Sequence, residues 1–99
     1  MPEILWMVGR PADISWRDWD DSLSAVYDDG SGDTHVLDAL AVELLELLLR
    51  QSLSIRQLIE ILADALPDDM DADVAHTFLE RQLQSLRDLG LVEQVAAPA

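Results

Sequence analysis

The most apolar stretch of the chain runs from Leu37 to Arg50, and its only interior charges after Asp38 are Glu43 and Glu46. A helix that is apolar on nearly every side has no face that prefers water, so this pattern predicts a buried central helix. The Asp38 carboxylate can accept a bond from an unpaired N–H of the first turn. The run is too short and too acidic to cross a bilayer, which needs ~20 largely uncharged residues.

Alternating apolar and polar residues predict strands before this helix. Ile14 and Trp16 share one side of a strand that should end in a turn at Asp20-Asp21. In the next strand we expect one face to be buried and the other to be wet. The face expected to be buried holds Leu23, Ala25 and Tyr27, and the wet one holds Ser22, Ser24 and Asp28.

The turn residues 28–33, with two glycines, should join that strand to a last one ending at Leu37. The apolar run Ile4 to Val8 is expected as an extra strand or as a docked arm. Val92 to Val95 could add a short edge strand, and 96–99 should fray.

Two further helices are expected after the central one. Ser54 and Gln57 have the spacing of a capping box, which opens a helix that stops before Pro67. A third helix should begin near Val74 and end at Gly90, where the chain can adopt the left-handed conformation. The sequence therefore predicts an α+β, winged-helix-like fold: a small three-stranded antiparallel sheet followed by a three-helix bundle. We expect an arm or extra strand over 1–13, the domain over 14–95 and a frayed tail over 96–99.

Charge and composition narrow the classes of function. The chain has 99 residues, no cysteine and a net charge of −14, with six arginines and no lysine. This length predicts one small domain, and the missing signal segment predicts a cytoplasmic location. A strongly acidic surface repels a phosphate backbone, so no nucleic-acid partner is expected, and because the most apolar run is too short to span a bilayer, no membrane partner is expected either.

Few side chains in the sequence are candidates for a metal, catalytic or modification site. His35 and His76 have no partner at metal-ligand spacing, and we expect His35 to be exposed opposite the face of Leu37. No catalytic residue, metal or cofactor is expected. Asp21-Ser22-Leu23 matches the motif around the modified serine of acyl carrier proteins, but Ser22 precedes a strand and not a helix. A winged-helix DNA-binding domain is the main alternative. Its third helix would need basic side chains for the DNA groove, but here the acidic residues Glu80 and Asp88 lie next to Arg81 and Arg87.

Several short segments of the chain carry a family resemblance at characteristic spacings. These segments are Trp16…Trp19-Asp20-Asp21, Val26-Tyr27-Asp28, Gly32-Asp33-Thr34-His35-Val36-Leu37, Ala41…Leu44 and Leu86…Leu89-Gly90-Leu91-Val92-Glu93. Together they resemble the PqqD-like peptide chaperones, which are recognition elements of ribosomally made, modified peptides. More narrowly, the pattern looks like that of the subgroup found with the HPr-rel-A gene system.

The resemblance implies a non-catalytic module that binds a precursor or leader peptide as an added strand and presents it to a modifying enzyme. It places the peptide along the strand of Asp33, Thr34, His35, Val36 and Leu37, in a groove with the third helix. One margin of that helix carries Val74, Phe78, Arg81 and Ser85, and the other carries Leu79 and Leu83. We favour the first margin, because it mixes an aromatic anchor with polar groups. A monomer and a homodimer formed by strand or segment exchange both remain open.

Overall fold

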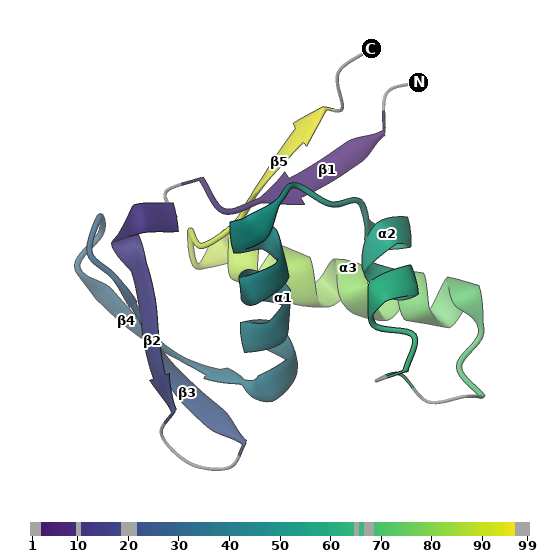
Figure 1. Ribbon diagram of the computed structural model, residues 1–99, viewed down its shortest axis with the longest axis horizontal. Coiled ribbons are helices and arrows are strands. Elements are labelled where there is room, and N and C mark those ends of the chain that lie inside the picture. Colours follow the sequence, from purple (N-terminus) through teal and green to yellow (C-terminus); the bar gives the residue numbers. More distant parts are fainter. Residues whose placement is uncertain (1–2, 10, 19–21, 65, 67–68, 97–99) are drawn as a thin grey trace.

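The computed structural model describes residues 3–9, 11–18, 22–64, 66 and 69–96. Three antiparallel strands are followed by three helices, and a separate two-stranded sheet joins the two ends of the chain (Figure 1). The predicted α+β class is confirmed. The elements are β1 (Ile4–Met7), a 3₁₀ turn (Pro11–Asp13), β2 (Ile14–Asp18), β3 (Leu23–Asp28), β4 (Asp33–Asp38), α1 (Ala39–Arg50), α2 (Ile55–Ile61), α3 (Ala72–Asp88) and β5 (Glu93–Ala96).

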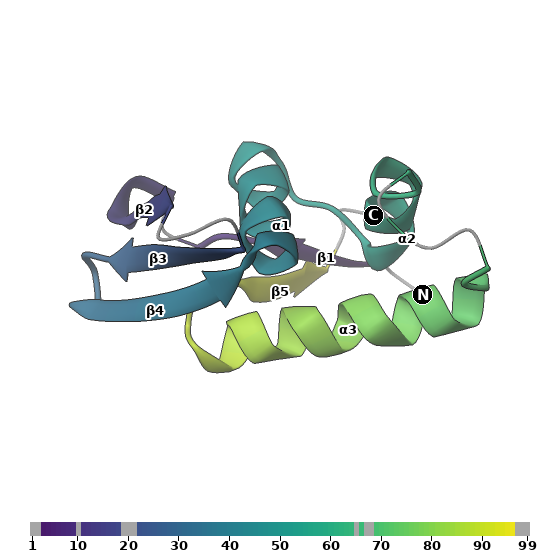
Figure 2. The same ribbon diagram turned by 90° about the horizontal axis from the view of Figure 1, so that it is seen from below.

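Helix α1 is the central helix that its sequence predicts. Asp38 caps it, because the Asp38 Oδ1 atom accepts a bond from the Ala41 N–H at 2.9 Å. Leu44 and Leu45 are fully buried in the core, whereas Glu43 and Glu46 are exposed. Figure 2 shows α1 and α2 on one side of the molecule and α3 running along the opposite side.

The other helix ends are also set by local bonds. Ser54 and Gln57 form the predicted capping box, with bonds of 3.1 and 2.9 Å between each side chain and the other residue's N–H. Helix α3 begins at Ala72, two residues before the predicted start at Val74, because Asp71 caps it. It ends as predicted: Gly90 has a φ of 79°, and the following N–H of Leu91 bonds to the Leu86 carbonyl at 3.0 Å.

The N-terminal segment is a strand. β1 pairs with β5 in antiparallel fashion, and on its other side Trp6 exchanges two backbone bonds with Leu53, of 2.8 and 3.1 Å. The Trp6 side chain is only 1% exposed and belongs to the main core. Ala96 of β5 pairs with Ile4 of β1, at the start of the segment 96–99 that the sequence predicted to fray, and 97–99 lie outside the described residues.

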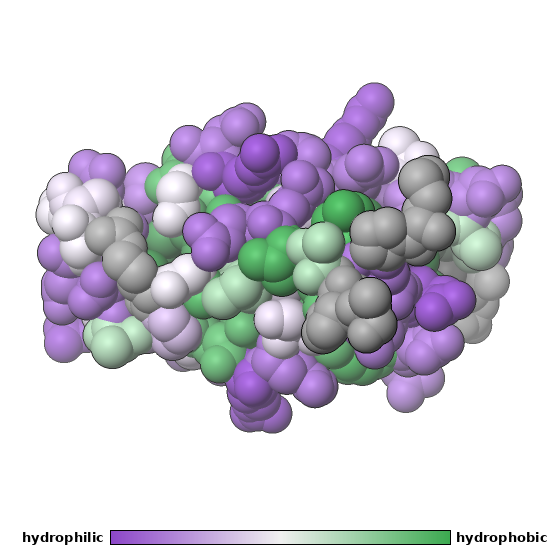
Figure 3. All heavy atoms as spheres, turned by 90° about the horizontal axis from the view of Figure 1, so that it is seen from above, coloured by the Kyte–Doolittle hydropathy of each residue, from purple (hydrophilic) through white to green (hydrophobic). Residues whose placement is uncertain are grey.

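The two-stranded sheet also has a partly apolar side away from Trp6. Leu5 faces its partner Val95 there, and both are half-buried. Seen from the side of β1 and β5, the surface has apolar residues in its middle and hydrophilic residues around them (Figure 3).

The predicted faces of β3 are wrong. Ser24, Val26 and Asp28 point inward, and Tyr27 is exposed. The two polar residues can face the core because local bonds satisfy them. The Ser24 hydroxyl donates to Asp18 at 3.2 Å, and the Asp28 carboxylate accepts from the turn N–H of Gly30 at 3.0 Å. The turn predicted at Asp20-Asp21 lies outside the described residues.

The predicted position of His35 is also wrong. Residues two apart in a strand share a face, so His35 lies on the same side as Leu37 and opposite Val26 of β3. The residue is half-buried, and its Nε2 atom is buried without a hydrogen-bond partner among the described residues.

Candidate functional site

Strand β4 is an edge strand. The strand order of its sheet is β2-β3-β4, so β3 pairs with one side of β4 and no strand of the described residues pairs with the other. In an antiparallel pair, alternate residues of an edge strand direct their N–H and C=O groups away from the sheet. All five residues predicted to bind peptide on this strand, Asp33 to Leu37, therefore lie along a backbone that can pair with a further strand.

An apolar depression adjoins this edge on the outer face of the sheet. It has a volume of about 370 Å³ and is lined by Arg17, Asp18, Ala25, Tyr27, Thr34 and Val36. Val36 and Tyr27, on neighbouring strands, are 49% and 38% exposed, and both line this depression. Ala25 and Tyr27 did not emerge from the sequence as site residues, because the two faces of β3 were assigned in reverse. The apolar residue Val26 interrupts the predicted alternation, and it was the feature of the sequence that could have indicated the correct faces of β3.

Helix α3 presents only one of its two predicted margins to solvent. Leu79 and Leu83 are fully buried and form core contacts, so this margin cannot receive a ligand. Val74, Phe78, Arg81 and Ser85 are all exposed, with Phe78 at 36%. This exposed margin faces away from β5, since Arg87 on the other flank of the helix bonds to Gln94 of β5 at 3.3 Å.

The exposed margin of α3 has its own depression, separate from that of the sheet. Its volume is about 410 Å³, and its lining is Asp73, Val74, Thr77, Phe78 and Arg81. Neither depression is lined by residues of both β4 and α3. The structure therefore does not bring the nine predicted residues into one pocket.

Distance along the helix explains this separation. Val74 and Ser85 are ~16 Å apart along the axis at 1.5 Å per residue. The C-terminal end of α3 lies at the end of the molecule that holds the β2-β3-β4 sheet, and its N-terminal end points away from that sheet (Figures 1 and 2). Ser85 is thus the predicted helix residue at the sheet end. Leu89, which the prediction did not include, is 39% exposed at the same end.

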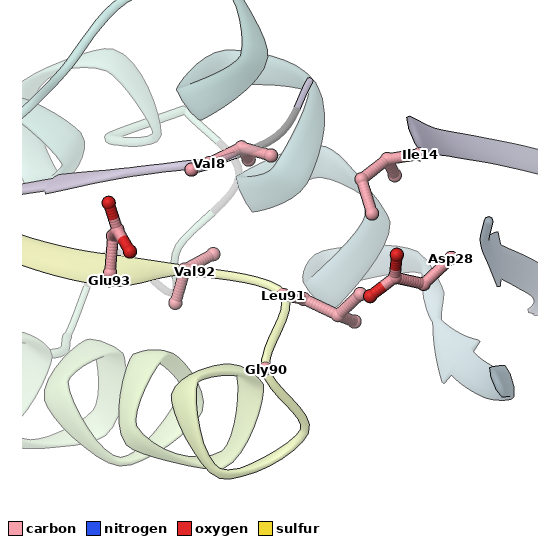
Figure 4. Close-up of a pocket in the computed structure, with 8 residues that line it drawn as sticks. Val8, Ile14, Asp28, Gly90, Leu91, Val92 and Glu93 are labelled. Atoms are coloured by element: carbon pink, nitrogen blue, oxygen red, sulfur yellow. The ribbon is translucent and has the colours of Figure 1, made fainter. Parts of the chain in front are cut away.

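A further pocket of about 220 Å³ is lined by the residues that follow β1, the first residue of β2, the last residue of β3 and the segment from Gly90 into β5. Figure 4 shows the Glu93 carboxylate directed toward β1 and the Asp28 carboxylate directed toward Leu91. The neighbouring Gly9 leaves room for Glu93, since a Cβ atom at Gly9 would come within 3.0 Å of that carboxylate. Among the described residues, no group of three or more histidine, aspartate or glutamate side chains could hold a metal ion.

Comparison of the chain with protein-family models, with curated proteins and with solved structures gives no match. No helix in the described part of the chain is long and apolar enough to span a membrane. A function must therefore be inferred from the edge of β4, the two depressions and the charge around them.

Proposed function

We propose that this domain is a non-catalytic peptide-binding module. It captures an extended segment of a precursor or leader peptide as a strand added to β4, and it presents that peptide to a modifying enzyme of the same gene system. The observation that carries this proposal is the outer edge of β4, a six-residue strand beside an apolar depression, with which no other strand of the described residues pairs.

Strand addition uses groups that the edge already offers. Each outward-facing residue of β4 supplies one N–H donor and one C=O acceptor, and an extended peptide can satisfy both. These main-chain bonds give affinity without sequence preference. Preference comes from alternate peptide side chains, which on the outer face would meet Thr34 and Val36 and the depression beyond them.

The exposed margin of α3 offers a second contact for a longer peptide. Its sheet end carries Ser85 and Leu89, and Phe78 lies two helical turns further from the sheet. A peptide that continues past β4 along this margin would reach Phe78, an aromatic side chain of the type that anchors interfaces.

The alternative function, duplex DNA binding, is less compatible with the charges on α3. The helix exposes Arg81 and Arg87, but Glu80 and Asp88 are exposed beside them. The domain as a whole carries a charge of −14, which opposes association with phosphates.

Single proline substitutions at Thr34, His35 and Val36 test the proposed function. The backbone N–H groups of Thr34 and Val36 point to one side of β4, and the N–H of His35 points to the other side. Proline at an outward-facing N–H should abolish binding of the cognate precursor peptide and leave the fold intact. Proline at an inward-facing N–H should instead break a bond to β3 and lower the melting temperature.

Alanine at the same three positions is the matched control, because it shortens the side chain and keeps the N–H. Calorimetry would measure peptide affinity and circular dichroism the melting temperature. Full binding by all three proline variants would contradict strand addition at β4.

A further inference from the structure

We propose that the peptide captured by β4 carries two basic residues five positions apart, with an apolar residue between them. This inference rests on the proposed function and specifies its substrate class. The expected ligand is a locally cationic, extended segment, and acidic segments should be rejected.

The two ends of β4 carry the charges that define this spacing. Asp33 is its first residue and Asp38 its last, and both are exposed; Asp38 caps α1 through its Oδ1 atom, so its other oxygen would meet the peptide. They lie ~17 Å apart at ~3.4 Å per strand residue. Asp33 pairs with the inward-facing Asp28, while Asp38 pairs with Leu23 on the other face, so the two carboxylates project from opposite faces of the sheet.

Around a strand added at this edge, the acidic side chains Asp18, Asp33 and Asp38 of the described residues outnumber the basic ones. Arg17 is the cation that lines the neighbouring depression, but it belongs to β2, at the far side of the sheet. At ~4.8 Å per strand, a peptide beyond β4 would lie ~14 Å from β2. This is a distance between backbones, and the Arg17 side chain shortens it, since it lines the same depression as Val36. Asp33 and Asp38 lie on the strand that the peptide would adjoin, Asp18 lines the same depression as Arg17, and the net charge of −14 acts in the same direction.

The apolar position follows from Val36. Its side chain is 49% exposed on the outer face, next to Ala25, its cross-strand partner. A peptide residue opposite Val36 would share that face and bury apolar surface against it. The basic residues lie opposite Asp33 and Asp38, and the apolar residue lies opposite Val36. A peptide parallel to β4 therefore has the sequence basic-x-x-apolar-x-basic, and an antiparallel peptide has the reverse order, basic-x-apolar-x-x-basic. The motif thus also reports the direction of the bound strand.

Selection from a random library of displayed twelve-residue peptides, with the full chain as bait, tests this inference. We expect enriched peptides to contain one of the two motifs. Enrichment of acidic or uncharged peptides that bind at β4 would overturn the inference and leave the proposed function intact. If no peptide is enriched above the level of bait-free beads, the proposed function itself is contradicted, and this inference with it.

Matched charge variants separate the local contact from the effect of net charge. Asp33→Asn removes a charge beside the proposed peptide, and Glu60→Gln removes one on the exposed side of α2. For the best enriched peptide we expect Asp33→Asn to weaken binding about threefold, the range of an exposed ion pair, and Glu60→Gln to change it by less than about 1.5-fold. Replacing both basic residues of the peptide with glutamate should weaken binding by about tenfold or more. Equal losses for the two protein variants would show that net charge alone attracts the peptide, and would overturn the inference.

Discussion

Replacing Trp6 with alanine should remove a large part of the stability of this domain. The side chain is 1% exposed, and a buried tryptophan removes ~150–250 Å² from water. At ~25 cal/mol per Å² this corresponds to ~4–6 kcal/mol, of which alanine retains a small part. Measured losses for such truncations are ~3–5 kcal/mol. A domain of this size has a total stability of only ~5–15 kcal/mol.

Thermal unfolding followed by circular dichroism measures this effect. A loss of ~3 kcal/mol or more should lower the melting temperature by ~12 °C or more in a domain of about 100 residues. Ile4→Ala in the same strand is the control, because Ile4 is 47% exposed and its truncation should cost ~1 kcal/mol or less. If Trp6→Ala melts within ~4 °C of the natural protein, then β1 is not part of the core and the interpretation of the N-terminal strand is wrong.

Three further predictions address the helix cap, the helix margin and the choice of ligand. Asp38→Ala should cost ~1 kcal/mol through loss of the N-cap bond to Ala41, whereas Asp64→Ala in an exposed turn should cost less than ~0.5 kcal/mol; equal melting temperatures would refute the cap. Phe78→Ala should weaken binding of a cognate peptide that reaches α3 by ~2 kcal/mol and lower stability by less, and a stability loss of ~3 kcal/mol or more would identify Phe78 as core. In gel shifts at physiological ionic strength the domain should not bind duplex DNA, and specific nanomolar retardation would contradict the peptide-binding proposal.

Helix boundaries were predictable because local bonds set them. The caps at Asp38 and Ser54 and the left-handed glycine at Gly90 each involve residues within five positions of one another. It was harder to predict from the sequence which strand residues face the core. Leu23, Ala25 and Tyr27 alternate in the sequence as a buried set would, but Val26 is the residue that reaches the core, and only the packing of α1 against the sheet decides this.

In the candidate site, too, the features set by local sequence could be predicted and those set by tertiary packing could not. The strand of Asp33 to Leu37 follows from the hairpin turn before it and the cap after it, so its position could be predicted locally. The two margins of α3 also follow from helical periodicity. Which margin is buried depends on the elements packed against the helix, and the separation of Phe78 from the sheet depends on the direction in which α3 leaves it (Figure 2). Neither is encoded in a local pattern.

Amide hydrogen exchange along β4, with and without a bound peptide, tests the central proposal most directly. Strand addition should protect alternate N–H groups within Asp33 to Asp38, because each outward-facing donor gains a partner. The outward-facing N–H groups of β2, at the other edge of the same sheet, should exchange at an unchanged rate. Tight binding of a peptide that leaves the β4 amides unprotected, or that protects β2 instead, would contradict the account.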